Sequence, residues 1–278
     1  MNLVIAEQFG AVRRLTLNRP EQRNALSRQL LGDLTESLQA AADDASTSAV
    51  VLRGAGNGFS AGAELGAESK NVGIWADRER LRRTYHHLED VFACPLPTVA
   101  AVHGFALAGG ADLALHCDFL IAADDALIGH PAVRSLGVPP TQMWLYRLGP
   151  QLAKRMLLTG DRISGTEAAR IGLAVHSCPS VDLDEIAMAF AQRIALIGRE
   201  LLMSNKAILN RGLDLMGRAT LGRFAEHEDA VGHLSPSMAQ FAASVRDHGI
   251  REAIRRRDAP FDPEPQQISG PVSGGAHD

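Results

Sequence analysis

The sequence predicts an α/β fold built on a largely parallel sheet. Apolar runs without polar alternation, typical of strands covered on both faces, lie at residues 49–52, 98–102 and 119–122. Helical periodicity appears between or beside them, at residues 77–93 and 109–116. This alternation is typical of βα units. From residue 140 onward the periodicity is mostly helical, so a helical region is expected to follow the sheet.

Length and composition describe an ordinary globular protein. A chain of 278 residues is long enough for a large core, and its net charge of −4 gives no general affinity for nucleic acid or anionic membranes. No apolar run reaches the length of a membrane span, and the N-terminus does not resemble a signal peptide. The three widely spaced cysteines show no metal-ligand spacing, so we expect reduced thiols, no metal and a cytoplasmic location.

The N-terminal part is expected to open with a hairpin. Two strand-like runs within residues 2–17 flank a turn at Phe9-Gly10. Ser27 is a candidate cap for the next helix, in which leucines recur every four residues from Leu26 to Leu38. The apolar run at 49–52 then follows as a buried strand.

The C-terminal part divides into helices and a tail. Segments with helical periodicity are residues 142–148, 151–158, 165–171, 183–197, 199–211, 221–231, 238–247 and 249–257. Residues 261–278 are rich in Pro, Gly and Ser and nearly free of apolar side chains, so we expect a disordered tail.

Two glycine-rich turns, each after a buried strand, are the strongest functional signal. In the first, residues 96–118, the pair Gly109-Gly110 precedes a short apolar helix with Asp112 in its first turn. A helix that begins at such a pair directs unpaired N–H groups and its positive dipole end outward. The second turn covers residues 54–65. Two free N–H groups that converge on one carbonyl oxygen would form an oxyanion hole.

A dinucleotide-binding motif is the competing interpretation of the second turn. Gly56, Gly58 and Ala61 match the relaxed fingerprint, and Asp77 lies about 20 residues further on. That motif needs a helix to begin inside it, whereas residues 59–63 are glycine-rich without an apolar stripe. We therefore favour the oxyanion hole over a nucleotide site.

Both turns resemble signatures of the crotonase family, the enoyl-CoA hydratases and isomerases. Residues 59–65, FSAGAEL, resemble its F-x-A-G-x-D/E-L signature, and residues 101–113, AVHGFALAGGADL, followed by Cys117-Asp118, resemble its second signature. Similar elements occur at residues 17–26, 158–174 and 249–261. The resemblance covers residues 10–261 in consistent order and spacing.

The resemblance implies both a fold and a ligand. It implies a spiral of ββα repeats over residues 1–195 that carries the acyl-CoA site, and a helical region over residues 196–260 that forms homotrimers or dimers of trimers. The substrate would be an acyl-CoA thioester, with no separate cofactor, because coenzyme A enters as part of the substrate. The backbone amides of Ala63 and Gly109 would hold the thioester oxygen as an enolate.

The acid/base positions depart from the family pattern. The first catalytic glutamate of the hydratases corresponds to Asp112, which is shorter by about 1.5 Å. The second normally follows a Gln-Pro or His-Pro pair, but here Ala132 follows His130-Pro131. His130 is either the replacement proton-transfer group or a packing residue. Arg134 either pairs with Asp112 or with an acidic group of the substrate, or it is a solvated side chain.

Four residues are expected to contact coenzyme A by the same resemblance. They are Arg23, Ala25, Ala61 and Leu65. Arginines 255–257 are an additional candidate for the phosphates, against the alternative of a solvated charged face. Glu64 is expected to be structural, and His103 and His116 are expected to be buried and hydrogen-bonded.

Three functions stay open at this point. The first is an enoyl-CoA hydratase/isomerase-type enzyme of fatty-acid or related acyl-CoA metabolism, with Asp112 as its sole carboxylate. The second is a thioester or C–C bond hydrolase of the same fold, in which His130 assists water. The third is an acyl-CoA-binding protein without catalysis. The products formed from acyl-CoA substrates would separate the three.

Overall fold

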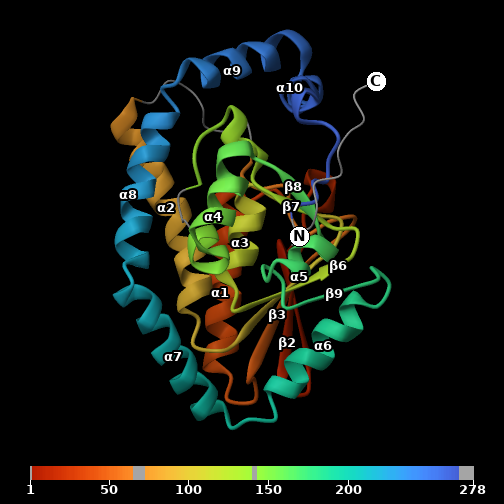
Figure 1. Ribbon diagram of the computed structural model, residues 1–278. Helices are drawn as coiled ribbons and strands as arrows, with labels where there is room; N and C mark the ends of the chain where they lie inside the picture. The colour runs from red at the N-terminus through yellow and green to blue at the C-terminus, as the bar shows by residue number, and fades with distance from the viewer. Residues whose placement is uncertain (1, 65–72, 140–142, 269–278) are drawn as a thin grey trace.

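A computed structural model describes residues 2–64, 73–139 and 143–268 and confirms the predicted α/β class (Figure 1). The main sheet has the order β1-β2-β3-β4-β6-β9, in which only the β1–β2 pair is antiparallel. These strands are β1 (Val4–Phe9), β2 (Val12–Leu17), β3 (Ala49–Gly54), β4 (Thr98–Val102), β6 (Phe119–Ala123) and β9 (His176–Cys178). The predicted N-terminal hairpin is therefore present and forms one edge of the sheet.

A second, smaller sheet creates the spiral. It contains β5 (Phe105–Leu107), β7 (Leu127–Gly129) and β8 (Arg162–Ser164), in the order β5-β7-β8. The chain passes from β4 in the main sheet to β5 in the small one and then into α3 (Gly109–His116). It repeats this path through β6 and β7 to the 3₁₀ helix η2 (Pro131–Arg134) and α4 (Met143–Thr159). These are the ββα turns that the resemblance implies.

Helices cover the sheet because each carries one apolar stripe. In α1 (Arg28–Asp43) the stripe is Leu30, Leu34 and Leu38, and Ser27 Oγ caps the helix by accepting the Leu30 N–H at 3.2 Å, as predicted. The other helices of this part are α2 (Ile74–Ala93), α5 (Gly165–Arg170) and α6 (Leu183–Ile194). Gly149 interrupts α4 with a non-helical backbone, between the two helices that the sequence predicts there.

Four further helices form the C-terminal region: α7 (Arg199–Leu215), α8 (Arg218–Gly232), α9 (Pro236–His248) and α10 (Ile250–Asp258). Helix α8 lies against α2, and α9 and α10 then return toward the small sheet (Figure 1). The 3₁₀ helix η3 (Ala259–Phe261) ends this region, and η1 (Pro20–Gln22) lies near the N-terminus. The C-terminal region thereby contacts segments much earlier in the chain: α8 contacts α2, and α10 contacts η2.

The prediction of a disordered tail from residue 261 is wrong for residues 262–268. Glu264 forms an ion pair with Arg134 at 2.6 Å and a second with Arg162. The Ile268 N–H donates to Glu167 Oε1 at 2.9 Å. The polar composition of the tail does not reveal that arginines distant in the sequence are its partners. Residues 269–278 lie outside the described residues.

Two glycines with similar backbones allow a matched test of packing at the turn after β4. Gly104 and Gly10 have φ of +57° and +59°. A methyl group at Gly104 would lie 1.9 Å from the Asn57 carbonyl oxygen, whereas one at Gly10 would meet nothing within 4 Å. Gly10→Ala is expected to lose about 1–2 kcal/mol of stability from backbone strain alone. Gly104→Ala is expected to lose about 1–3 kcal/mol more through overpacking. Urea unfolding checks this, and equal losses would contradict it.

Candidate functional site

The structure brings the amides of Ala63 and Gly109 together. A bridge between Leu26 and Ala63 uses the Leu26 N–H bonded to Gly62 O at 2.9 Å and the Glu64 N–H bonded to Leu26 O at 3.4 Å. The N–H of Ala63 takes no part in either bond. Gly109 is the first residue of α3, so its N–H has no intrahelical acceptor. A methyl group at Gly109 would lie only 3.4 Å from the Ala63 nitrogen.

The backbone before Gly109 is strained. Ala108 has φ of +51° and ψ of −127°, a conformation that costs a non-glycine residue about 1–3 kcal/mol. It is held there by two bonds: its N–H donates to Gly129 O at 2.9 Å, and its carbonyl accepts the Asp112 N–H at 3.1 Å. Opposite it, Gly62 has φ of +95°, and a methyl group there would lie 2.7 Å from Leu107 O. The turn that presents Gly109 is therefore fixed on both sides.

A buried carboxylate lies one turn into α3. Asp112 is 1% exposed, and its Oδ2 lies 3.2 Å from His130 Nε2. Its Oδ1 accepts a hydrogen bond from the Trp144 indole N–H at 3.1 Å. Among the described residues, His130 Nδ1 has no hydrogen-bond partner. Asp112 and His130, which the sequence singles out separately, form one buried pair.

Trp144 is a site residue that sequence reasoning misses. It belongs to α4, 32 positions from Asp112, and no spacing links the two. Because a hydrogen bond to a charged group contributes about 1.5–3 kcal/mol, Trp144→Phe is expected to lower the free energy of unfolding by that amount. Trp75→Phe is the matched control, since Trp75 is 76% exposed. Chemical denaturation of both variants checks this, and equal stabilities would contradict it.

Both interpretations of Arg134 are wrong. Its side chain is 1% exposed, so it is not solvated, and it contacts Asp258 and Glu264 rather than Asp112. The guanidinium also lies 3.8 Å from the centre of the Phe261 ring. Arg134 therefore anchors the C-terminal segment. Ala132, which follows His130-Pro131, lies in η2, and its methyl side chain offers no acid/base group.

Three of the four predicted coenzyme A residues lie together. The Ala61 N–H donates to Arg23 O at 3.0 Å, and Ala25 O accepts a hydrogen bond from Arg19 at 2.8 Å. The exposed Arg23 guanidinium lies 4.3 Å from the centre of the Phe105 ring. Leu65, the fourth, lies outside the described residues.

Other predicted charged residues have structural partners. Glu64 pairs with Arg19 at 2.7 Å, which agrees with its expected structural role. Arginines 255 and 256 pair with Glu252, and Arg257 pairs with Asp258. The coenzyme A role of this cluster therefore stays a prediction.

The two histidines expected to be structural differ in burial. His116 is 1% exposed, and its Nδ1 lies 2.6 Å from Asp112 O. His103 is hydrogen-bonded to Gly56 O at 3.0 Å but is not buried, so the expectation of burial is wrong for it. His103 lies just beyond the end of β4, where the chain is open to a cleft.

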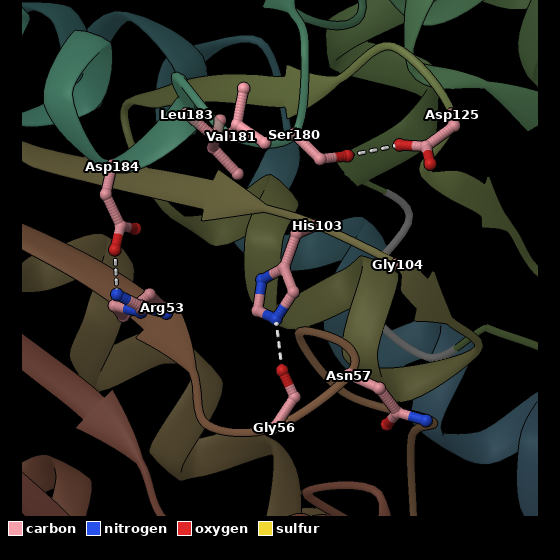
Figure 2. Close-up of a pocket in the computed structure, with 10 residues that line it drawn as sticks. All are labelled: Arg53, Gly56, Asn57, His103, Gly104, Asp125, Ser180, Val181, Leu183 and Asp184. Atoms are coloured by element: carbon pink, nitrogen blue, oxygen red, sulfur yellow. Dashed lines mark hydrogen bonds and ion pairs between the residues drawn. The ribbon is translucent and has the colours of Figure 1, made fainter.

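Figure 2 shows this cleft, of about 330 Å³, at the carboxyl ends of parallel strands. It is lined by Arg53, Gly56, Asn57, His103, Gly104, Asp125, Ser180, Val181, Leu183 and Asp184. Its polar side chains largely satisfy one another: Arg53 pairs with Asp184, and Ser180 donates to Asp125. None of the predicted site residues lines it, so we place the candidate site at Ala63, Gly109 and Asp112.

The described ranges contain neither a membrane-spanning helix nor a cluster of metal ligands. No helix within residues 2–64, 73–139 and 143–268 is long and apolar enough to cross a membrane. The same residues contain no group of three or more His, Cys, Asp or Glu side chains placed to hold a metal ion.

The spiral of ββα turns, with two adjacent amides before a buried carboxylate, matches one class of protein. The family described as enoyl-CoA hydratase/isomerase matches residues 7–231, and the chain belongs to this family.

Individual relatives extend the similarity over nearly the whole chain. A crotonyl-CoA hydratase of Syntrophomonas wolfei is 34% identical over 264 residues, covering 93% of this chain and 97% of the relative. An enoyl-CoA isomerase/hydratase of Mycosarcoma maydis is 37% identical over 229 residues, covering 75% and 83%. The crystal structure of an enoyl-CoA hydratase/isomerase from Xanthobacter autotrophicus superposes with a TM-score of 0.88 at 37% identity, covering 94% and 99%.

Proposed function

We propose that this protein acts on an acyl-CoA thioester by stabilising an enolate, in a reaction of the enoyl-CoA hydratase/isomerase type. One observation carries the proposal. The amides of Ala63 and Gly109 are adjacent, and Asp112 lies three residues beyond Gly109 in the first turn of the same helix. Donors placed where negative charge develops are often the largest single contribution to catalysis.

The chemistry follows from where the charges lie. The thioester oxygen accepts both amide N–H groups at the positive end of the α3 dipole, which favours the enolate. The Asp112–His130 pair takes the proton from the carbon next to the thioester. Delivery of a proton to a different carbon then shifts the double bond. Addition of water needs a further proton-transfer step.

One observation favours a hydrolase as the second candidate. The buried His130 Nδ1 has no partner within the described part of the chain, so a neutral imidazole there has an unused nitrogen. Such a nitrogen accepts a proton from water that attacks the thioester carbonyl or a ketone of the acyl group. The two candidates differ in product, because thioester hydrolysis releases free coenzyme A.

A panel of acyl-CoA substrates analysed by mass spectrometry tests the proposal. Isomerised or hydrated products from 2-enoyl-, 3-enoyl- or 3-hydroxyacyl-CoA substrates would support it. Free coenzyme A or a cleaved acyl chain would support the hydrolase instead. Binding of acyl-CoA without any product would show a binding protein.

We also propose a homotrimer, or a dimer of trimers, formed through the helical region, and a cytoplasmic location. The proposal of a trimer is supported by large apolar side chains that are 60–75% exposed on and beside α7 and α8. They are Leu201, Ile208, Leu209, Leu215, Met216 and Phe224. Sedimentation equilibrium of the full chain measures the oligomeric state, and a monomer would contradict this assembly.

A further inference from the structure

A second buried carboxylate, that of Asp229, lies on a helix of the C-terminal region. Asp229, on α8, is 3% exposed. Its Oδ1 accepts the Val138 N–H at 2.9 Å, and its Oδ2 accepts the Tyr85 hydroxyl hydrogen at 2.9 Å. Tyr85 belongs to α2, the helix that also packs against α3. Residues from three distant segments therefore meet at this carboxylate.

The loop after Ala132 is shaped to receive Asp229. Gly137, five residues beyond Ala132, has φ of +147°. A methyl group at Gly137 would lie 2.4 Å from Asp229 Oδ1, so a side chain at this position would displace the carboxylate. Asp229 thus contacts the loop that follows η2, the 3₁₀ helix in which Ala132 takes the position of the family's second glutamate.

The charges of the Tyr85–Asp229 pair and of the Asp112–His130 pair act on each other. Burial raises the pKa of Asp229, with His130 among the nearby groups that oppose the shift. Burial, together with the charges of Asp229 and Asp112, raises the pKa of the Tyr85 hydroxyl well above its usual value. His233 Nε2 also faces Asp229, at 3.5 Å, and its Nδ1 lies 2.6 Å from Asp77. Contacts between the helices agree with this proximity: Glu89 of α2, one turn beyond Tyr85, lies 3.7 Å from Nε2 of His116 of α3, one turn beyond Asp112.

We propose that Tyr85 and Asp229 form a second proton-transfer unit of the site, in place of the carboxylate absent at position 132. The inference rests on the proposed function. Helix α2 packs against both α3 and α8, so Tyr85 is the member of the pair carried by the helix next to Asp112, and its hydroxyl is the group proposed to meet the substrate. Asp229 is buried and acts through Tyr85, as a positioning residue that holds the hydroxyl and resupplies its proton.

In a double-bond shift, each of the two units carries out one proton transfer. Asp112–His130 removes a proton from C2, which breaks one C–H bond and leaves the enolate on the Ala63 and Gly109 amides. The Tyr85 O–H gives its proton to C4, which forms one C–H bond as the double bond moves into conjugation with the thioester. For this step Asp229 starts protonated, so that its Oδ2–H faces the Tyr85 oxygen across the same contact and passes that proton to it as the hydroxyl proton leaves. Solvent then takes the proton from Asp112–His130 and supplies one to Asp229, so the balance is restored.

Separate assays for the two proton transfers test the proposal. Deuterium exchange at C2 of a saturated acyl-CoA in D₂O reports Asp112–His130 alone, and conversion of 3-enoyl-CoA to 2-enoyl-CoA requires both units. Asp229→Asn and Tyr85→Phe are each expected to lower kcat for conversion about 100-fold, with KM and C2 exchange within threefold of wild type. The double variant is expected to be no worse than either single one, because the residues act as a unit.

Four further measurements separate this role from a structural one. The wild-type kcat–pH profile is expected to have a limb that disappears in Asp229→Asn. Asp229→Glu is expected to restore part of the activity. Glu228→Gln, an exposed neighbour on α8, is the matched control and should keep wild-type rates. Burial raises the folded-state pKa of Asp229, so the ionised carboxylate costs stability as pH rises from the ordinary carboxyl pKa to the folded-state pKa. Asp229→Asn is therefore expected to unfold at pH 8 at a temperature no lower than that of wild type.

The outcomes are distinguishable. Conversion by Asp229→Asn within threefold of wild type, with an unchanged pH profile, would overturn the proposal and leave the proposed function standing. Equal loss of C2 exchange and conversion in Asp229→Asn would also overturn it, since a general structural role would then explain the loss. C2 exchange without conversion in the wild type would overturn this inference alone. Absence of C2 exchange and of isomerised and hydrated products in the wild type would overturn the proposed function itself, and this inference with it.

Discussion

Replacing Asp112 with asparagine is expected to lower kcat about 1000-fold or more, because general acid–base groups contribute about 10²–10⁴-fold to rate. The variant should still fold. The asparagine carbonyl can accept the Trp144 N–H at the place of Oδ1, and its amide can donate to His130 at the place of Oδ2. The change thus removes the charge and the proton-accepting oxygen while it keeps the volume. Steady-state kinetics on the most active substrate of the panel measure the effect.

A matched substitution controls for the loss of a negative charge. Asp247→Asn changes an exposed residue of α9 and is expected to stay within twofold of wild type. Circular dichroism of both variants verifies the fold. Retention of a tenth or more of the wild-type kcat in Asp112→Asn would show that another group moves the proton.

The second large effect is expected at Arg134. Its side chain and that of Glu264 are each 1% exposed, and the two are 2.6 Å apart. Because removal of one partner leaves a buried charge without full compensation, Arg134→Met is expected to lower the free energy of unfolding by about 3–5 kcal/mol. Urea denaturation of the full chain measures this loss.

An exposed ion pair of the same region is the comparison. Arg255 pairs with Glu252 on α10, and its side chain is 68% exposed. Arg255→Met is expected to cost less than about 1 kcal/mol, as is usual for solvated pairs. If both arginine substitutions had the same small effect, the anchoring of residues 262–268 by Arg134 would be refuted.

Long periodic elements of the fold are predictable from sequence, and short ones are not. The leucine stripe and Ser27 cap of α1 indicate that helix correctly, because cap and stripe are local features. β5, β8 and β9 have three residues each, too few to show a strand period, and β5 lies beside the glycine signal at Gly104. The prediction of disorder fails for residues 262–268 because Glu264 binds partners that are distant in sequence.

The same distinction applies to the site. Ala63, Gly109, Asp112 and His130 are found by the resemblance because they lie within or beside motifs of the family. Trp144, Tyr85 and Asp229 come from three helices, at positions that no local pattern marks. Only the packing of α2 and α4 against α3, and of α8 against α2, brings them near Asp112, so their roles depend on tertiary structure.

The most direct test of the proposed enolate is C2 proton exchange in the variant Gly109→Ala. The added methyl group would lie 3.4 Å from the Ala63 nitrogen, beside the oxygen that both amides would bind, with no contact shorter than 3.4 Å to disturb the fold. Gly212→Ala, within α7 and with nothing within 4 Å, is the control. Mass spectrometry of a saturated acyl-CoA incubated in D₂O follows the exchange. We expect wild type and Gly212→Ala to incorporate deuterium at C2, and Gly109→Ala to be slower by about 100-fold or more. Exchange by Gly109→Ala at the wild-type rate would contradict an enolate held between Ala63 and Gly109.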